Sequence, residues 1–288
     1  MDTEQQKTER KYVNVKEAIR QKNPKLARMI PGFVLNYFKN HIVHQDDLNN
    51  VIRLYGDRTG VPFIDGALQY MNTTVKLVGL ENIPREGRYI IASNHPLGGL
   101  DGLALMWAVY KRRPDLIFPV NDILMNVKNL EPLFIPINKH GSNAQNIGII
   151  NDTFESDKIV CYFPAGLVSR KQKRGVIKDL DWQPTFITKA KRFKRDIIPT
   201  HISGRNSNFF YNLANLRKKL HIKANLEMFF LVDEFYKQKN KELKITFGKP
   251  VPYGYFDKRY KKDEWANLLR DFVYKLDENP AAEFTVDR

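Results

Sequence analysis

A single cysteine, Cys161, stands in a chain of 288 residues, and no apolar run approaches the roughly 18 residues that a transmembrane helix needs. One cysteine cannot form a disulfide within the chain, so we expect folding without cross-links in a reducing compartment. Cys161 lies in an apolar segment, which favours a small buried side chain. The first eleven residues are polar and charged, so no secretory signal is expected among them.

Motifs that mark several common enzyme classes are absent as well. The sequence has no Walker loop, no dinucleotide-binding fingerprint, no zinc-binding spacing of cysteine and histidine, and no Gly-x-Ser-x-Gly elbow around a serine nucleophile. We therefore expect neither a bound metal ion nor a resident cofactor.

Basic residues outnumber acidic residues. The chain carries 47 Lys and Arg against 32 Asp and Glu, a formal net charge of +15. The imbalance is greatest between Arg170 and Lys223, a segment that contains fifteen basic residues and only three acidic residues, all aspartates. This segment suits an anionic membrane, an acidic carrier protein or a nucleic acid, and a solvated face without a partner is the plain alternative. The apolar stripe over Leu26–Phe38 suits either a membrane anchor or packing against the core.

Two segments in which a strand runs into a turn stand out. Residues 89–92 form an apolar run that predicts a buried strand, a turn rich in glycine and proline follows, and residues 102–110 predict a helix. His95 leaves the strand, and Asp101 lies just beyond the turn. A carboxylate can hold one imidazole nitrogen as N–H and leave the other free to accept a proton from a hydroxyl. A structural histidine beside a helix-capping aspartate is the alternative.

The second segment runs over residues 159–170. An apolar strand again enters a turn, Phe163-Pro164-Ala165-Gly166, and Ser169 and a basic run follow it. Amides in such a turn can stabilise an oxyanion, and cations can hold an anionic head group. One turn with a base and another with amides and cations together suit acyl transfer.

With these residues in place, the chain resembles the glycerolipid and lysophospholipid acyltransferase superfamily over roughly residues 73–253. The first motif of that superfamily is Asn-His, a short spacer and Asp, matched here by Asn94, His95 and Asp101. Its third motif is Phe-Pro-Glu-Gly, matched by residues 163–166. The second and fourth motifs have counterparts at residues 133–139 and 196–204. Four motifs in the right order make the resemblance specific.

Three departures from the superfamily motifs indicate which branch the chain resembles. Five residues separate His95 from Asp101 where four are usual. Ala165 replaces the glutamate of the third motif, and Lys139 stands where glycerophosphate enzymes often have an arginine. This pattern resembles the hemolysin-like branch, which includes acyltransferases that make ornithine or glycine lipids. It implies an amino-acid lyso-lipid as the acceptor, with 1-acylglycerol-3-phosphate as the alternative.

The resemblance implies an O-acyltransferase in which His95 takes the proton of the acceptor hydroxyl and Asp101 orients the imidazole. An acyl-carrier protein or coenzyme A thioester would donate the acyl group, and no nucleic acid would take part. The enzyme would act as a peripheral protein at the cytoplasmic face of an anionic membrane. The other site residues it implies are loop and oxyanion positions, Asn94, Gly98, Gly99 and Gly166, and substrate contacts, Lys139, Phe163, Pro164, Ser169, Arg170 and Arg205.

Strands and helices alternate from residue 73 onward, which predicts an α/β fold with a central mixed, largely parallel sheet flanked by helices. We assign residues 1–72 to an N-terminal helical extension, a candidate membrane-docking element, and residues 73–288 to the catalytic domain. Strands are expected at 74–79, 88–93, 116–120, 133–137, 158–163, 197–202, 226–232 and 243–247. Helices are expected at 14–22, 25–40 (split or kinked at Pro31-Gly32), 45–56, 61–71, 102–112, 143–155, 184–194, 208–220 and 263–276.

A non-catalytic basic module that binds membranes or nucleic acid is the alternative from another functional class. It explains the charge but not the order of the four motifs. Consumption of an acyl thioester in the presence of a lyso-lipid would distinguish the two.

Overall fold

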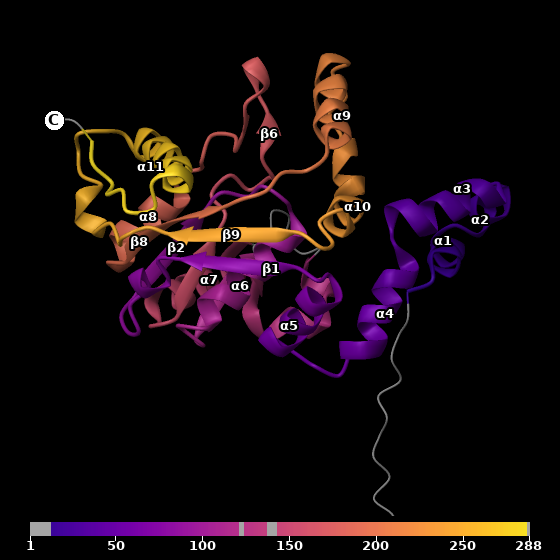
Figure 1. Cartoon of the computed structure of the whole chain (residues 1–288), viewed down its shortest axis with the longest axis horizontal. Coiled ribbons are helices and arrows are strands. Elements are labelled where there is room, and N and C mark those ends of the chain that lie inside the picture. Colours follow the sequence, from indigo (N-terminus) through magenta and orange to yellow (C-terminus); the bar gives the residue numbers. More distant parts are fainter. Residues whose placement is uncertain (1–12, 121–123, 137–142, 287–288) are drawn as a thin grey trace, which may run out of the picture.

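The computed structural model describes residues 13–120, 124–136 and 143–286 of the chain. A seven-stranded sheet forms its centre, in the order β1-β9-β8-β2-β5-β3-β4 (Figure 1). Its strands are β1 (Thr74–Val78), β2 (Tyr89–Ser93), β3 (Leu116–Val120), β4 (Phe134–Pro136), β5 (Ile159–Tyr162), β8 (Asp196–Ile202) and β9 (Glu242–Phe247). A separate hairpin consists of β6 (Arg170–Lys171) and β7 (Ile177–Lys178).

Strand direction divides the sheet into two blocks. Neighbouring strands are parallel except for β8 and β9, which are antiparallel. The block β8-β2-β5-β3-β4 therefore runs one way, and β1 and β9 run the other. The predicted mixed, largely parallel sheet is confirmed. The carboxyl ends of the larger block and the amino ends of β1 and β9 share one edge of the sheet.

Helices cover both faces of the sheet, as an α/β fold requires. Helices α5 and α6 cover one face, and α8 and α11 cover the other. The α-helices are α1 (Val15–Lys22), α2 (Pro24–Met29), α3 (Gly32–Tyr37), α4 (Gln45–Tyr55), α5 (Val61–Tyr70), α6 (Gly99–Tyr110), α7 (Asn143–Glu155), α8 (Thr185–Phe193), α9 (Asn208–Lys219), α10 (Leu231–Tyr236) and α11 (Lys262–Glu278).

Alternation along β2 shows how the sheet is buried on both sides. Ile91 joins the apolar cluster beneath α5 and α6, whereas Ile90 and Ala92 join the cluster beneath α8 and α11. All three side chains are fully buried. Because successive side chains of a strand point to opposite faces, a strand covered on both sides requires a run without polar residues.

The sheet places the two predicted motif turns side by side. β2 and β5 pair in parallel, with Ala92 opposite Tyr162. Both strands therefore end at the same edge, where His95 follows β2 and the turn at 163–166 follows β5. Active residues of open α/β sheets lie at such carboxyl ends.

One predicted strand is wrong. Residues 226–232 form a 3₁₀ turn, η6 (Leu226–Phe230), and the start of α10. Glu227, the second residue of this apolar run, is fully buried and pairs with the guanidinium groups of Arg170 and Arg217. The periodicity of a short apolar run does not distinguish a strand from a helical turn. Here the run forms a helical turn, and the two ion pairs of Glu227 connect it to β6 and α9.

The helix predicted over residues 25–40 is interrupted at Pro31, whose ring and missing N–H break a helix. A π-helical turn, η1 (Phe38–Ile42), follows α3. Together α1, α2, α3 and η1 form an N-terminal arm (residues 15–42) beside the body of the molecule (Figure 1). Within the described ranges, each helix is too short or too polar to traverse a lipid bilayer.

Candidate active site

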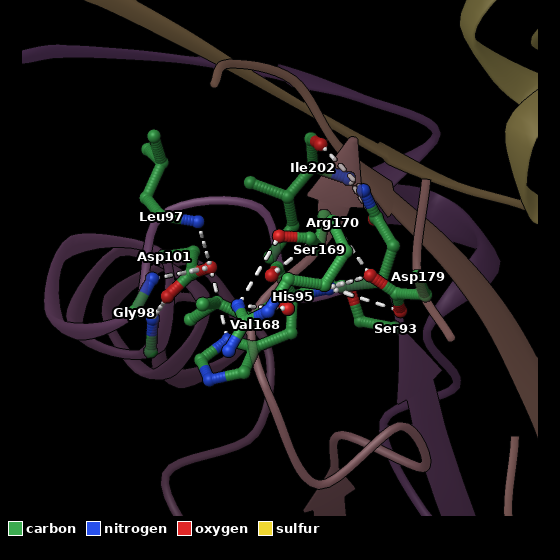
Figure 2. A network of polar contacts seen from close by, with 12 residues as sticks. Ser93, His95, Leu97, Gly98, Asp101, Val168, Ser169, Arg170, Asp179 and Ile202 are labelled. Carbon is green, nitrogen blue, oxygen red and sulfur yellow. Dashed lines mark hydrogen bonds and ion pairs between the residues drawn. The ribbon is translucent and has the colours of Figure 1, made fainter. Parts of the chain in front are cut away.

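His95 and Asp101 form a close pair at the carboxyl end of β2 (Figure 2). His95 Nδ1 lies 3.0 Å from Asp101 Oδ2. The imidazole side chain retains 16% exposure, whereas the carboxylate is fully buried. Asp101 is the third residue of α6, so its side chain reaches back over the first turn of this helix. The two residues meet in spite of the spacer of five residues between them.

Backbone amides hold the Asp101 carboxylate in place. Its Oδ2 accepts hydrogen bonds from the N–H of Leu97 at 2.7 Å and of Gly98 at 3.2 Å, and its Oδ1 accepts one from the N–H of Gly102 at 2.8 Å. A buried charge requires such donors. The carboxylate also favours the proton of a neutral His95 on Nδ1, which leaves Nε2 free to accept another proton.

A second buried carboxylate, Asp179, supports the backbone of His95 (Figure 2). Its two oxygens lie 3.2 and 3.3 Å from the His95 nitrogen, which donates its N–H. Asp179 also accepts hydrogen bonds from the Ser169 hydroxyl at 2.6 Å and from Trp182 Nε1 at 2.9 Å. The Ser169 N–H in turn donates to the His95 carbonyl at 2.7 Å. Asp179 thus ties the His95 loop to the loop after β5.

Sequence reasoning missed this support. Asp179, Trp182 and Tyr274 all lie outside the four motifs, and the Tyr274 hydroxyl accepts the Asp179 N–H at 2.8 Å. The one available signal was that Asp179 is the first acid after the basic run that follows the third motif. Burial raises the pKa of Asp179, although its hydrogen bonds oppose this effect.

An aromatic ring covers the imidazole. The rings of Phe163 and His95 are stacked with centroids 4.1 Å apart, and Phe118 packs edge-on against Phe163. Burial alone would lower the pKa of His95, but the charge and hydrogen bond of Asp101, together with the charge of Asp179, outweigh it. The pKa of His95 is therefore raised above its ordinary value of 6.5. The site stabilises an imidazolium once it has formed.

Comparison with known proteins decides the family. A family model described as acyltransferase matches residues 17–281 of the chain. The chain belongs to this acyltransferase family. Similar proteins include the lyso-glycine lipid O-acyltransferase of Bacteroides thetaiotaomicron, 45% identical over 92% of this chain and 97% of the relative. The protein of the same name from Phocaeicola vulgatus is 44% identical over 92% of this chain and 95% of the relative.

Among solved structures, the 1-acyl-sn-glycerophosphate acyltransferase PlsC from Thermotoga maritima aligns with 88% of this chain and 94% of its own, at 13% identity and a TM-score of 0.44. The superfamily predicted from the four motifs is confirmed by the family match and by the two relatives. The protein is an acyltransferase.

Three loop residues implied by the resemblance shape the turn of this acyltransferase. The Asn94 side chain bridges to β8: its Nδ2 donates to the Ile202 carbonyl at 2.9 Å, and its Oδ1 accepts the Ile202 N–H at 2.7 Å. Gly98 has a φ of +95°, in the region that favours glycine. Gly99 lies against Phe235, whose ring would come within 3.2 Å of an added Cβ.

The turn after β5 is closed by its own backbone. Gly166 has a φ of +65°, and its N–H donates to the Phe163 carbonyl at 3.1 Å. The carbonyl of Pro164 accepts the N–H of Gln183 at 3.0 Å. The amide that the sequence suggested as an oxyanion donor is thus engaged within the turn.

Arg170 and Ser169 point into the protein. The Arg170 guanidinium donates to Glu227 at 2.9 Å and to the Val168 carbonyl at 2.8 Å, and it is almost fully buried. Ser169 is buried as well, with its hydroxyl on Asp179. The structure places the cation in an internal ion pair rather than at a surface where a substrate head group could meet it.

Arg205 is exposed and lies at the rim of a groove of about 450 Å³ that Ser203 and Tyr274 also line. His201 lines the same groove, and burial lowers its pKa to about 4. Lys139 lies outside the described residues. Within the described ranges, no group of three His, Cys, Asp or Glu side chains is arranged to hold a metal ion.

Proposed function

We propose that this acyltransferase transfers a fatty acyl group from an acyl thioester to the hydroxyl of a lyso-glycine lipid. Two relatives that carry this activity in their names are 45% and 44% identical over 92% of the chain. The observation that supports the chemistry is the pair of His95 and Asp101, 3.0 Å apart, with the imidazole partly exposed and the carboxylate buried.

In the proposed reaction, Nε2 of His95 removes the proton of the acceptor hydroxyl while the oxygen attacks the thioester carbonyl. The tetrahedral intermediate then collapses and its C–S bond breaks. The leaving thiolate takes the proton from the imidazolium, so an ester and a free thiol are formed. Asp101 stays ionised throughout, holds the Nδ1–H and stabilises the imidazolium, as the carboxylate of a catalytic triad does.

The oxyanion that develops on the thioester carbonyl requires nearby N–H donors. The turn at 163–166 is our candidate, because it adjoins His95 through the stacked Phe163 ring and because Gly166 is exposed without a side chain. The Gly166 N–H already donates to the Phe163 carbonyl at 3.1 Å. An oxyanion bound there must therefore compete with that carbonyl.

Basic side chains would recognise the anionic groups of the substrates. A glycine head group linked through its nitrogen has a free carboxylate, and the pantetheine of either an acyl-carrier protein or coenzyme A carries phosphate. Arg205, exposed at the groove rim, and Lys139 are our candidates for these contacts. Arg170, paired internally with Glu227, acts instead by positioning the loop after β5.

A lyso-lipid acceptor resides in a bilayer, so we propose peripheral contact with the cytoplasmic face of an anionic membrane. Residues 1–72 would serve as a docking element and residues 73–288 as the catalytic domain. In the N-terminal arm, Met29 is 78% exposed and Phe33 is 77% exposed, which are high values for large apolar side chains.

The test is acylation by the purified protein of a detergent-dispersed lyso-glycine lipid, with an acyl-carrier protein thioester and a coenzyme A thioester compared as donors. We expect a doubly acylated glycine lipid and release of one thiol per ester formed. The His95→Ala protein is the control. Preference for lysophosphatidate over the lyso-glycine lipid would refute the proposed acceptor, and no thioester consumption with either acceptor would refute the proposed reaction.

A further inference from the structure

The molecule exposes an apolar surface that the proposed chemistry does not use. Outside the N-terminal arm, exposed large apolar side chains concentrate on α9, η6 and the first turn of α10. We call this the α9–η6 surface. Its exposed apolar residues are Phe209, Leu216, Leu220, Ile222, Phe229 and Val232.

Helix α9 has two apolar stripes, of which the protein buries one. Phe210 and Ala214 face the interior. Phe209, Leu216 and Leu220 are separated by seven and four residues, which places them on one line along the helix, and each is at least half exposed. A helix at the surface of a globular protein normally carries polar residues on its outer side, so a second apolar stripe indicates that something else covers it.

Basic residues without acidic partners surround this stripe. No Asp or Glu occurs from residue 205 to residue 223. Lys218, Lys219 and Lys223 are exposed, and none takes part in an ion pair among the described residues. Their charges are therefore available to an anionic partner.

The hairpin of β6 and β7 extends the same surface. Asn215 of α9 donates to the carbonyl of Lys171 at 3.3 Å, so α9 and β6 are neighbours. The tip of the hairpin exposes Val176 together with two further cations, Lys173 and Arg174. Figure 1 shows the hairpin and α9 rising from the same side of the sheet.

The α9–η6 surface also adjoins the N-terminal arm. Asp233 of α10 accepts a hydrogen bond from His44, just after the arm, at 2.9 Å, and the His44 ring stacks on Tyr236 with centroids 4.7 Å apart. Helix α10 therefore links the α9–η6 surface to the N-terminal arm.

We propose that the α9–η6 surface docks the enzyme on an anionic lipid bilayer. The proposal rests on the proposed function, in which the acceptor is a lipid. Cations attract an anionic leaflet, and aromatic and aliphatic side chains beside them then enter the interface. Protein interfaces are depleted in lysine, which is abundant here. A nucleic acid would match the charge but leave the apolar stripe in water.

The basic segment predicted from the sequence is thereby split into two surfaces. Helix α8 packs beside α11, away from α9 (Figure 1). Two of its cations make internal contacts: Lys189 donates to Asn151 and Lys191 to the Phe256 carbonyl, each at 2.6 Å. Arg192 and Lys194 are exposed and offer a matched control for the lysines of α9.

The experiment compares Lys218→Glu/Lys219→Glu with Arg192→Glu/Lys194→Glu, because both double variants change the net charge equally. Sedimentation with vesicles of equimolar phosphatidylcholine and phosphatidylglycerol is measured. Each cation near an anionic surface contributes roughly fivefold, so the α9 pair should weaken binding by about tenfold or more, and the α8 pair by less than about twofold. Leu220→Ser/Phe229→Ser should also weaken binding, without any change of charge.

Equal losses from the two charge pairs would show that net charge alone matters and would overturn the proposal. Unchanged vesicle binding in the α9 and apolar variants would overturn it as well. Activity on a detergent-dispersed acceptor is measured in parallel and should persist, because none of these residues belongs to the proposed catalytic site. If the wild-type protein shows no activity on the detergent-dispersed acceptor, the proposed function is refuted. The vesicle sedimentation still tests the docking proposal, because it does not depend on turnover.

An acyl-carrier protein is the competing occupant of this surface. In that case the α9 variants would keep vesicle binding but lose turnover with the carrier-protein thioester, while turnover with the coenzyme A thioester would persist. That pattern would refute membrane docking by this surface.

Discussion

Asp179 accepts the backbone N–H of His95 with both carboxylate oxygens, at 3.2 and 3.3 Å. The same histidine meets Asp101 through its ring, at 3.0 Å. One buried acid thus fixes the main chain of the proposed base, and the other fixes its side chain. The two carboxylates come from segments that lie far apart in the sequence, so the position of the imidazole depends on the tertiary fold.

Replacement of Asp179 by Asn should lower kcat by about 10- to 100-fold with little change in KM, because small displacements of a reacting group are costly. It should also move the acid limb of the pH–rate profile to lower pH, since the charge of Asp179 raises the pKa of His95. A purely structural role would not shift that limb. Asp181→Asn, at an exposed acid two residues away, is the control and should change neither quantity.

Replacement of His95 by Ala should reduce turnover by about 10²- to 10⁴-fold, the usual contribution of a general base. The free energy of unfolding should stay close to that of the wild type, because the imidazole is partly exposed. His41→Ala, at an exposed histidine of η1, should retain activity. Turnover near the wild-type rate in a well-folded His95→Ala protein would rule out the mechanism.

The pH dependence should follow the ionisation of His95. A general base must be neutral to accept a proton, and the pKa of His95 is raised above 6.5. The value of kcat/KM should therefore rise with pH through an apparent pKa above 6.5 and then level off. Asp101→Asn removes the charge that raises this pKa, so the limb should move to lower pH and the plateau should fall. A limb that stays in place or moves to higher pH would contradict this account.

Replacement of Glu227 by Gln should destabilise the fold by about 3–5 kcal/mol, the usual cost of leaving buried charges without a partner. The two cations affected are Arg170, at 2.9 Å from Glu227, and Arg217, at 2.7 Å. Urea denaturation measures the change. Glu242→Gln, at an exposed position of β9, is the control and should stay within about 0.5 kcal/mol of the wild type. A loss below 1 kcal/mol at Glu227 would show that the ion pairs matter little.

The sheet and the His95–Asp101 pair could be predicted because local patterns determine them. Apolar runs bounded by glycine and proline define β2 and β5, and two such strands in an α/β order end at one edge. The pairing of His95 with Asp101 needs only a strand, a turn and the first turn of a helix. Each of these steps spans a few residues.

The supporting contacts could not be predicted, because they join distant parts of the chain. Asp179 lies 84 residues after His95, and Glu227 lies 57 residues after Arg170. The basic run after the third motif suggested that Arg170 contacts the substrate. In the fold Arg170 points inward and pairs with Glu227, an acid within the apolar run 226–232. Only the tertiary structure decides which cation lines an open groove and which pairs with a buried carboxylate.

The reversed direction of β1 bears on how the protein can be tethered. The amino end of β1 lies at the edge of the sheet that holds His95. If β1 instead ran in the same direction as β2, β3, β4, β5 and β8, it would begin at the opposite edge, roughly 17 Å away. The carboxyl-terminal tail packs at the opposite edge, beside the amino end of β8, where the ring centroids of Phe284 and Tyr255 are 5.6 Å apart. Immobilisation or fusion at the C terminus would therefore leave the edge of the sheet that holds His95 facing outward.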